Sequence, residues 1–201
     1  MPGFNPDEPR DETGKWTAFD ASIGLREAAS DSKISSAVAA YQSTLFDAIN
    51  NELRYDRPDK YKDVIDKLDK ASVDKTNDKL YRGMDSNFVK EIGQKYKITD
   101  ISDVNELKTK LVGQKIHDKS FMSTSRDLSV AADFARDKGN GKTAVLQIDG
   151  DKKGIEVANH VKNLRATKEK EFLIKRNSTL VIKDVSISKS GKLILYTEIE
   201  K

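Results

Sequence analysis

The first periodic apolar pattern in the chain begins after residue 30. Apolar side chains then recur at spacings of three and four, which is the repeat of one helix face, and Asp31 and Ser32 supply a cap at its start. Pro58 ends this helical region, and a second helix is expected directly after it. The two apolar faces consist of Ile34, Val38, Tyr41, Leu45, Ile49 and Leu53 in the first helix and of Tyr61, Val64, Ile65 and Leu68 in the second.

Beyond residue 78, short apolar runs bounded by turn residues predict strands. The first is a short strand at 80–82 that breaks at Gly83. Helices are expected near 88–92, 104–111 and 128–136. Helices first and strands afterwards indicate an α+β domain with mostly antiparallel sheets. The remaining strands are predicted at 115–125, 143–149, 169–175, 179–187 and 193–199.

Residues 1–30 show no apolar period. Three of the four prolines of the chain lie there among acidic side chains, so we expect a flexible tail. The segment lacks the basic start and the apolar stretch of a secretory signal peptide. A chain of 201 residues suits one well-packed domain, which we assign to residues 31–201 with the N-terminal helices included.

Composition narrows the chemistry. The chain has no Cys, which excludes disulfides, thiolate zinc sites and a cysteine nucleophile. His117 and His160 are the only histidines and have no second ligand at a suitable spacing, so no metal site is expected. A formal net charge of +3 is small for a nucleic-acid-binding protein, and no apolar stretch approaches the length that spans a bilayer. We therefore expect neither a nucleic acid nor a membrane as a partner.

Three short motifs at predicted strands carry candidate chemistry: 81–83 (Tyr-Arg-Gly), 123–125 (Ser-Thr-Ser) and 169–171 (Glu-Lys-Glu). An arginine offers a rigid fork of donors that suits phosphate, and an adjacent glycine permits a close backbone approach. Side chains alternate along a strand, so Glu169 and Glu171 are expected on one face, where both carboxylates reach a single cleft.

Each motif also has an ordinary structural explanation. The glutamates suit a charged strand entry, Thr124 or Ser125 suits the cap of the helix that follows, and a lone arginine at a strand end suits the surface. Taken singly, the motifs leave both interpretations open.

Together and in this order, the motifs resemble the Arg, Ser-Thr-Ser and Glu-x-Glu signature of mono-ADP-ribosyltransferases, which split NAD and transfer its ADP-ribose to a protein. The resemblance covers residues 80–182 and is to the branch of bacterial binary-toxin catalytic subunits and related exoenzymes. It implies a split fold of two antiparallel sheets at an angle, with N-terminal helices and with NAD in the cleft between the sheets. No metal is implied.

The resemblance also implies roles for the motif residues. Glu171 matches the glutamate that hydrogen-bonds the nicotinamide ribose and stabilises an oxocarbenium-like state. Ser123 matches the serine that holds this ribose and braces the glutamate, while Thr124 and Ser125 stabilise the strand turn.

Four further residues complete the implied NAD site. Arg82, with Gly83 beside it, matches the arginine that contacts NAD. Phe134 falls where such enzymes place an aromatic ring against the nicotinamide, although a Phe on an Ala-rich helix also suits a core. Arg136 is a candidate phosphate contact, one position out of register with the binary-toxin pattern.

Acceptor choice depends on Glu169. In the resembled family a glutamate at this position accompanies transfer to arginine, because a carboxylate orients an incoming guanidinium and helps to deprotonate it. The loop at 163–167 lacks the aromatic residue with which several toxins grip their target, so the target protein stays unidentified.

The resemblance thus predicts transfer of ADP-ribose from NAD to a protein arginine, with release of nicotinamide. Two alternatives stay open, an NAD glycohydrolase that uses water as the acceptor and an inactive binding module of the same fold. The expected site of action is the cytoplasm of a host or target cell. Both a toxin-like effector and a phage-encoded enzyme suit this expectation.

Overall fold

The structure is a computed structural model that describes residues 34–135, 137, 141–161 and 168–200. The chain divides into two compact units after Ala71. The expected tail at 1–30 and the loop at 163–167 lie outside the described residues.

The first unit contains the two predicted helices. Helix α2 (Ile34–Ala40), a π-helical segment (Tyr41–Leu45) and helix α3 (Phe46–Arg54) follow one another without a break in the helical backbone. Pro58 then opens a 3₁₀ turn (Pro58–Tyr61), where its missing N–H costs nothing, and the turn leads into α4 (Lys62–Ala71). The predicted apolar faces are buried, which confirms both helices; they include Val38, Tyr41, Leu45, Ile49, Leu53, Val64, Ile65 and Leu68.

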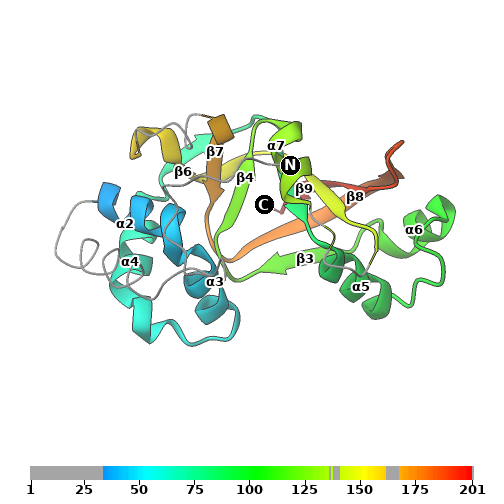
Figure 1. Cartoon of the computed structure of the whole chain (residues 1–201), viewed down its shortest axis with the longest axis horizontal. Coiled ribbons are helices and arrows are strands. Elements are labelled where there is room, and N and C mark those ends of the chain that lie inside the picture. Colours follow the sequence, from blue (N-terminus) through cyan, green and yellow to red (C-terminus); the bar gives the residue numbers. More distant parts are fainter. Residues whose placement is uncertain (1–33, 136, 138–140, 162–167, 201) are drawn as a thin grey trace, which may run out of the picture. The chain divides into compact units, whose positions relative to one another are not determined.

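The second unit is built on a curled sheet (Figure 1). Among the described residues it has nine strands in the order β1-β6-β7-β4-β2-β5-β9-β8-β3. All neighbouring pairs are antiparallel except β5 with β9, which is parallel. A largely antiparallel sheet with helices packed against it confirms the predicted α+β class. The strands are β1 (Asp74–Thr76), β2 (Leu80–Met84), β3 (Lys115–Asp118), β4 (Met122–Ser125), β5 (Ala144–Asp149), β6 (Lys152–Glu156), β7 (Glu171–Ile174), β8 (Ser178–Ile187) and β9 (Leu193–Ile199).

A narrow junction divides the sheet into two halves. Strands β1, β6, β7 and β4 form one half, and β2, β5, β9, β8 and β3 form the other. In the described part of the chain the halves are paired only at Tyr81 opposite Ser125, whereas β4 pairs with β7 along its whole length. The predicted split therefore takes the form of one sheet with a single-pair hinge between β2 and β4.

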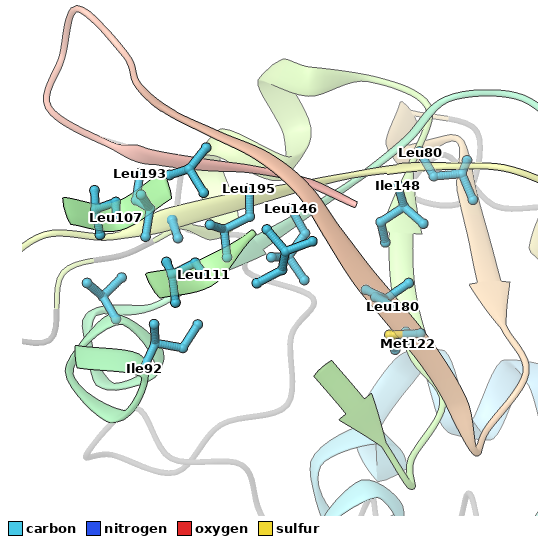
Figure 2. Close-up of a cluster of buried hydrophobic side chains, with 14 of the residues drawn as sticks. Leu80, Ile92, Leu107, Leu111, Met122, Leu146, Ile148, Leu180, Leu193 and Leu195 are labelled. Carbon is cyan, nitrogen blue, oxygen red and sulfur yellow. The ribbon is translucent and has the colours of Figure 1, made fainter. Parts of the chain in front are cut away.

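The main core lies on one face of this sheet (Figure 2). Helices α5 (Ser86–Lys95) and α6 (Val104–Leu111) supply Ile92, Leu107 and Leu111, which pack with Leu193 and Leu195 of β9. A second, smaller cluster packs helix α7 (Leu128–Phe134) against β2 and β5 through Ala131, Ala135, Val145 and Tyr81. None of the helices in the described ranges has the length and apolar composition needed to cross a membrane.

The predicted continuous strand at 115–125 is wrong. Asp118 ends β3 by accepting hydrogen bonds from the main-chain N–H of Ser120 (2.9 Å) and from its hydroxyl (2.7 Å). Such a local side-chain turn competes with the strand ladder. The chain is redirected from the edge of the sheet, where β3 pairs with β8, to the centre, where β4 lies between β7 and β2.

Two further expectations for strands need correction. Gly83 lies within β2, so the strand continues where a break was expected. The strand predicted at 169–175 begins at Glu171 as β7, which affects the candidate site directly.

Candidate active site

The three sequence motifs meet on three neighbouring strands. Arg82 of β2 donates from Nη1 to the main-chain oxygen of Ser123 on β4, over 3.0 Å. Ser125, at the end of β4, lies opposite Glu171 at the start of β7 and opposite Tyr81 of β2. Residues separated by more than forty positions in sequence therefore gather at the junction between the two halves of the sheet.

Strand geometry places Glu171 on the same face as two serines. Directly opposite residues in an antiparallel pair share a face, so Glu171 lies on the same face as Ser125. Ser123 is two residues before Ser125 on β4 and therefore shares this face. The alternate residues Met122 and Phe172 point the other way, into the main core. Glu171 is 8% exposed, so it is largely withdrawn from water. Electrostatic interactions are stronger in such a poorly solvated setting than in water.

Two hydroxyls of the triplet link β4 to β7 and to the residues directly before β7. Thr124 donates from Oγ1 to the main-chain oxygen of Phe172, and Ser125 donates from Oγ to the main-chain oxygen of Glu169, over 2.6 Å. The helix-cap interpretation of these two residues is wrong, because α7 begins at Leu128 and is capped by Asp127, whose carboxylate accepts from the N–H of Ser129. Ser123 is the partly exposed member of the triplet.

Glu169 does not share the strand with Glu171. Lys170 between them has a φ of 45°, in the left-handed region, and this conformation interrupts the alternation on which the one-face prediction rested. Glu169 is helical, and Lys170 forms the turn between it and β7. The N–H of Arg126 donates to the Lys170 oxygen over 3.3 Å. The Lys170 ammonium also lies 3.8 Å from the Asp127 carboxylate. Contacts with Arg126 and Asp127, after β4, thus position the turn at Lys170. The position of Glu169 is therefore not set by the alternation of a strand.

Gly83 allows helix α7 to pack closely against β2. A Cβ at this position would lie 2.1 Å from the main-chain oxygen of Ala131 and 2.6 Å from the nitrogen of Ala135, both at α7. The close approach that the glycine permits in this structure is that of the helix. Because α7 packs on Tyr81, which pairs with Ser125, the helix lies on the same side of the sheet at the junction as the serine.

Phe134 ends helix α7 and is 48% exposed, so the core interpretation of this ring is wrong. The helix end is held from a distant part of the chain: the Lys192 ammonium, before β9, donates to the main-chain oxygen of Ala135 over 2.9 Å and to the Thr143 hydroxyl over 3.2 Å. A lysine at a helix C-terminus also complements the helix dipole. Arg136 lies outside the described residues.

Two residues with prominent site contacts were missed by the sequence reasoning, Lys192 and Arg126. Lys192 contacts Ala135 and Thr143, which are far from it in sequence, so no local pattern identified it. For Arg126 the available signal was its position directly after the Ser-Thr-Ser triplet.

The histidines are not grouped with other metal-ligating residues. His117 contacts the Thr179 hydroxyl through Nδ1, over 3.0 Å. Within the described ranges, no cluster of three or more His, Cys, Asp or Glu side chains suited to a metal is present.

Comparison with known proteins agrees with the geometry. A family model described as ADP-ribosyltransferase exoenzyme matches residues 21–200. No curated protein sequence matches the chain significantly.

Solved structures share the fold. The C3 exoenzyme of Clostridium limosum is similar with a TM-score of 0.61 and 17% identity, over 90% of this chain and 91% of that one. C3stau2 of S. aureus, solved with NAD, is similar with a TM-score of 0.57 and 15% identity, over 92% and 96%. The ADP-ribosyltransferase Vis, solved with agmatine, is similar with a TM-score of 0.60 and 18% identity, over 100% and 88%.

The family match extends over nearly the whole chain, and the three motifs converge at the centre of its sheet. The chain therefore belongs to the ADP-ribosyltransferase exoenzyme family, whose enzymes use NAD as the substrate that donates ADP-ribose.

Proposed function

We propose that this chain is a mono-ADP-ribosyltransferase of the Arg, Ser-Thr-Ser and Glu-x-Glu class, which transfers ADP-ribose from NAD to an arginine of a target protein and releases nicotinamide. The observation that carries the proposal is the meeting of Arg82, Ser123 and Glu171 on adjacent strands. Three unrelated surface features would not be expected to meet at one junction.

Glu171 is the proposed catalytic carboxylate. In the reaction, the bond between the nicotinamide nitrogen and the ribose carbon breaks, and its electron pair leaves with nicotinamide. The ribose then carries positive charge in an oxocarbenium-like state, which a nearby carboxylate stabilises. The buried setting of Glu171 supports this role, because a charge held in a poorly solvated site acts more strongly on a developing opposite charge.

Arg82 and Ser123 are the proposed NAD-positioning residues, with Gly83 and Thr124 in support. The bond from the Arg82 guanidinium to Ser123 holds this cation beside the triplet, where its planar fork suits a pyrophosphate. Phe134 is exposed at the end of α7, as a ring that stacks on nicotinamide would have to be. We assign Arg136 to a phosphate contact on the resemblance alone.

Arginine is the proposed acceptor group. A nitrogen of its guanidinium forms the new bond to the ribose carbon, and Glu169 accepts the proton that this nitrogen loses. Support comes from the position of Glu169, which lies outside β7 and whose main-chain oxygen accepts from Ser125. Further support is the similarity to Vis, which was solved with the guanidine compound agmatine. The target protein is left open, and the proposed place of action is the cytoplasm of a host or target cell.

The proposal is tested by incubating the chain with NAD and with bacterial or eukaryotic lysates. Mass spectrometry is expected to find the ADP-ribose mass on arginine side chains, and chromatography to find released nicotinamide. Glu171→Gln, which keeps the shape but loses the charge and replaces one acceptor oxygen with an NH₂ donor, is the control and should abolish both signals. Nicotinamide release without a modified peptide would indicate an NAD glycohydrolase, and no release at all would indicate an inactive binding module.

A further inference from the structure

The junction between the two sheet halves needs more than its main-chain pairing. The halves meet at the single pair Tyr81 and Ser125, and the residues of the proposed reaction lie on both sides: Arg82 on β2 and Glu171 on β7. A single residue pair leaves the angle between the two halves weakly restricted by the main chain. Side-chain contacts at the junction must therefore contribute to the distance between these groups.

Arg126, the residue directly after β4, makes such contacts. Its Nε donates to Oδ2 of Asp78 over 2.7 Å, and its Nη1 and Nη2 donate to the two carboxylate oxygens of Glu156 over 3.1 and 2.7 Å. Asp78 lies in the connection that leads from β1 to β2, and Glu156 ends β6. The guanidinium therefore ties the entry of one half of the sheet to the other half.

The network extends to the partners on each side. The N–H of Glu156 donates to Asp74 of β1 over 2.8 Å, and the N–H of Asp78 donates to the Thr76 hydroxyl over 3.1 Å. The hydrogen bond from Arg126 also holds the pKa of the Asp78 carboxyl below its usual range. The Asp78 carboxylate therefore remains charged and paired with Arg126 at neutral pH.

Arg126 also contacts the turn at Lys170, directly before Glu171. Its main-chain N–H donates to the Lys170 oxygen, and its guanidinium carbon lies 5.6 Å from the centre of the Phe172 ring, the residue after Glu171. One residue thus contacts the main chain on one side of Glu171 and the ring on the other.

We propose, on the basis of the proposed function, that Arg126 is a positioning residue for ADP-ribose transfer. Its guanidinium sets the angle between the two sheet halves and its main chain sets the turn before β7, so that Glu171 and Glu169 are held in place relative to Arg82. Only a planar fork with several donors satisfies Asp78 and both oxygens of Glu156 together, so lysine cannot replace it.

The test compares Arg126→Lys with Lys183→Met. Lys183 forms an exposed ion pair with Glu198 on the far half of the sheet, 3.0 Å long, and serves as the matched control for loss of a surface salt bridge. Arg126→Lys is expected to lower kcat for nicotinamide release at least tenfold, since small displacements of catalytic groups cost large factors in rate. Lys183→Met is expected to leave kcat within twofold.

Asp78→Asn provides a second variant that removes one arm of the network and keeps the arginine. It should lower kcat in the same direction, and the double variant Asp78→Asn, Arg126→Lys should be no slower than Arg126→Lys alone, because both changes break one network. The folded fraction of every variant is measured by thermal unfolding, so that rates refer to folded protein.

Wild-type kcat in folded Arg126→Lys would overturn the inference, as would losses that multiply in the double variant. The unaltered chain separates this failure from failure of the proposed function. Nicotinamide release by the unaltered chain with no effect of Arg126→Lys contradicts only the positioning role, whereas absence of release by the unaltered chain contradicts both.

Discussion

Ser125 lies opposite Glu171 across the β4–β7 pair, and its hydroxyl donates to the main-chain oxygen of Glu169, 2.6 Å away. One serine therefore pairs with the proposed catalytic glutamate through its main chain and bonds the proposed acceptor glutamate, which is helical, through its side chain. Ser125 also accepts from the N–H of Asp127, over 2.9 Å, which couples both to the start of α7.

The two outer serines of the triplet should respond differently to alanine. Ser125→Ala removes a hydroxyl bonded on two sides, so we expect a loss of about 1 to 2 kcal/mol in the free energy of unfolding. Ser123→Ala should leave that free energy within about 0.5 kcal/mol and lower kcat for nicotinamide release, because Ser123 is assigned to the ribose. Chemical denaturation and nicotinamide assays check both. An equal stability loss in both variants would contradict the assignment.

Replacing Glu169 should separate transfer from hydrolysis. Glu169→Gln is expected to lose most transfer to arginine and to retain much of the slow hydrolysis of NAD, because water needs less help with orientation and deprotonation than a guanidinium does. Agmatine modification and nicotinamide release are measured in parallel. Equal loss of both activities would assign Glu169 to cleavage of NAD itself.

Two glycine substitutions test the close packing of α7 on β2. Gly83→Ala places a methyl group against the main chain of the helix, so we expect a loss of about 3 kcal/mol in the free energy of unfolding. Gly93 in α5 is the control: outside its chain neighbours and the backbone of its own helix, no heavy atom lies within 4 Å of an added Cβ. Alanine there should stabilise the helix by about 1 kcal/mol. Urea unfolding measures both, and a neutral Gly83→Ala would contradict the close approach.

Glu106 should contribute a pH-dependent part of the stability. Hydrogen bonds from Lys110, from the main chain of Thr99 and Asp100 and from the Thr99 hydroxyl lower its pKa from 4.5 to about 2. Because the folded-state pKa is the lower one, the contribution is complete above the unfolded value of 4.5 and is lost as the pH falls through about 2.

Glu106→Gln should therefore be less stable than the unaltered chain at pH 7, and the difference between the two should shrink as the pH falls from 5 towards 2. Glu91→Gln, at an exposed position on α5, is the control for loss of one negative charge from a helix. Thermal unfolding at a series of pH values gives the comparison. A stability difference that stays constant down to pH 2 would contradict the role of the carboxylate.

Local patterns were sufficient for several elements. The expected helix at 104–111 and the strand at 193–199 agree with α6 and β9 in both bounds, because amphipathic spacing and a capping Asp103, or an apolar run after Gly191, are visible within a few residues. The three motifs were also visible in the sequence, where their order carried the resemblance to a family.

Short polar strands escaped prediction. Strands β1 and β6 have few apolar residues, and β6 begins with Lys152, which is 1% exposed and donates to the main-chain oxygen of Ile148. Burial lowers the pKa of this lysine, so its setting is unusual for a charged group. Such segments become strands because they pair with other strands, a contact that their own sequence does not reveal.

The sequence by itself determined the α+β class, the long helices and the three motifs, since each depends on neighbouring residues in the chain. Tertiary structure alone decided that Lys170 adopts a left-handed conformation and that Arg126 joins Asp78 to Glu156. These features depend on contacts between segments thirty or more residues apart, or on a turn that such contacts hold. No local periodicity encodes them, because the energy that selects them appears only once the strands have paired.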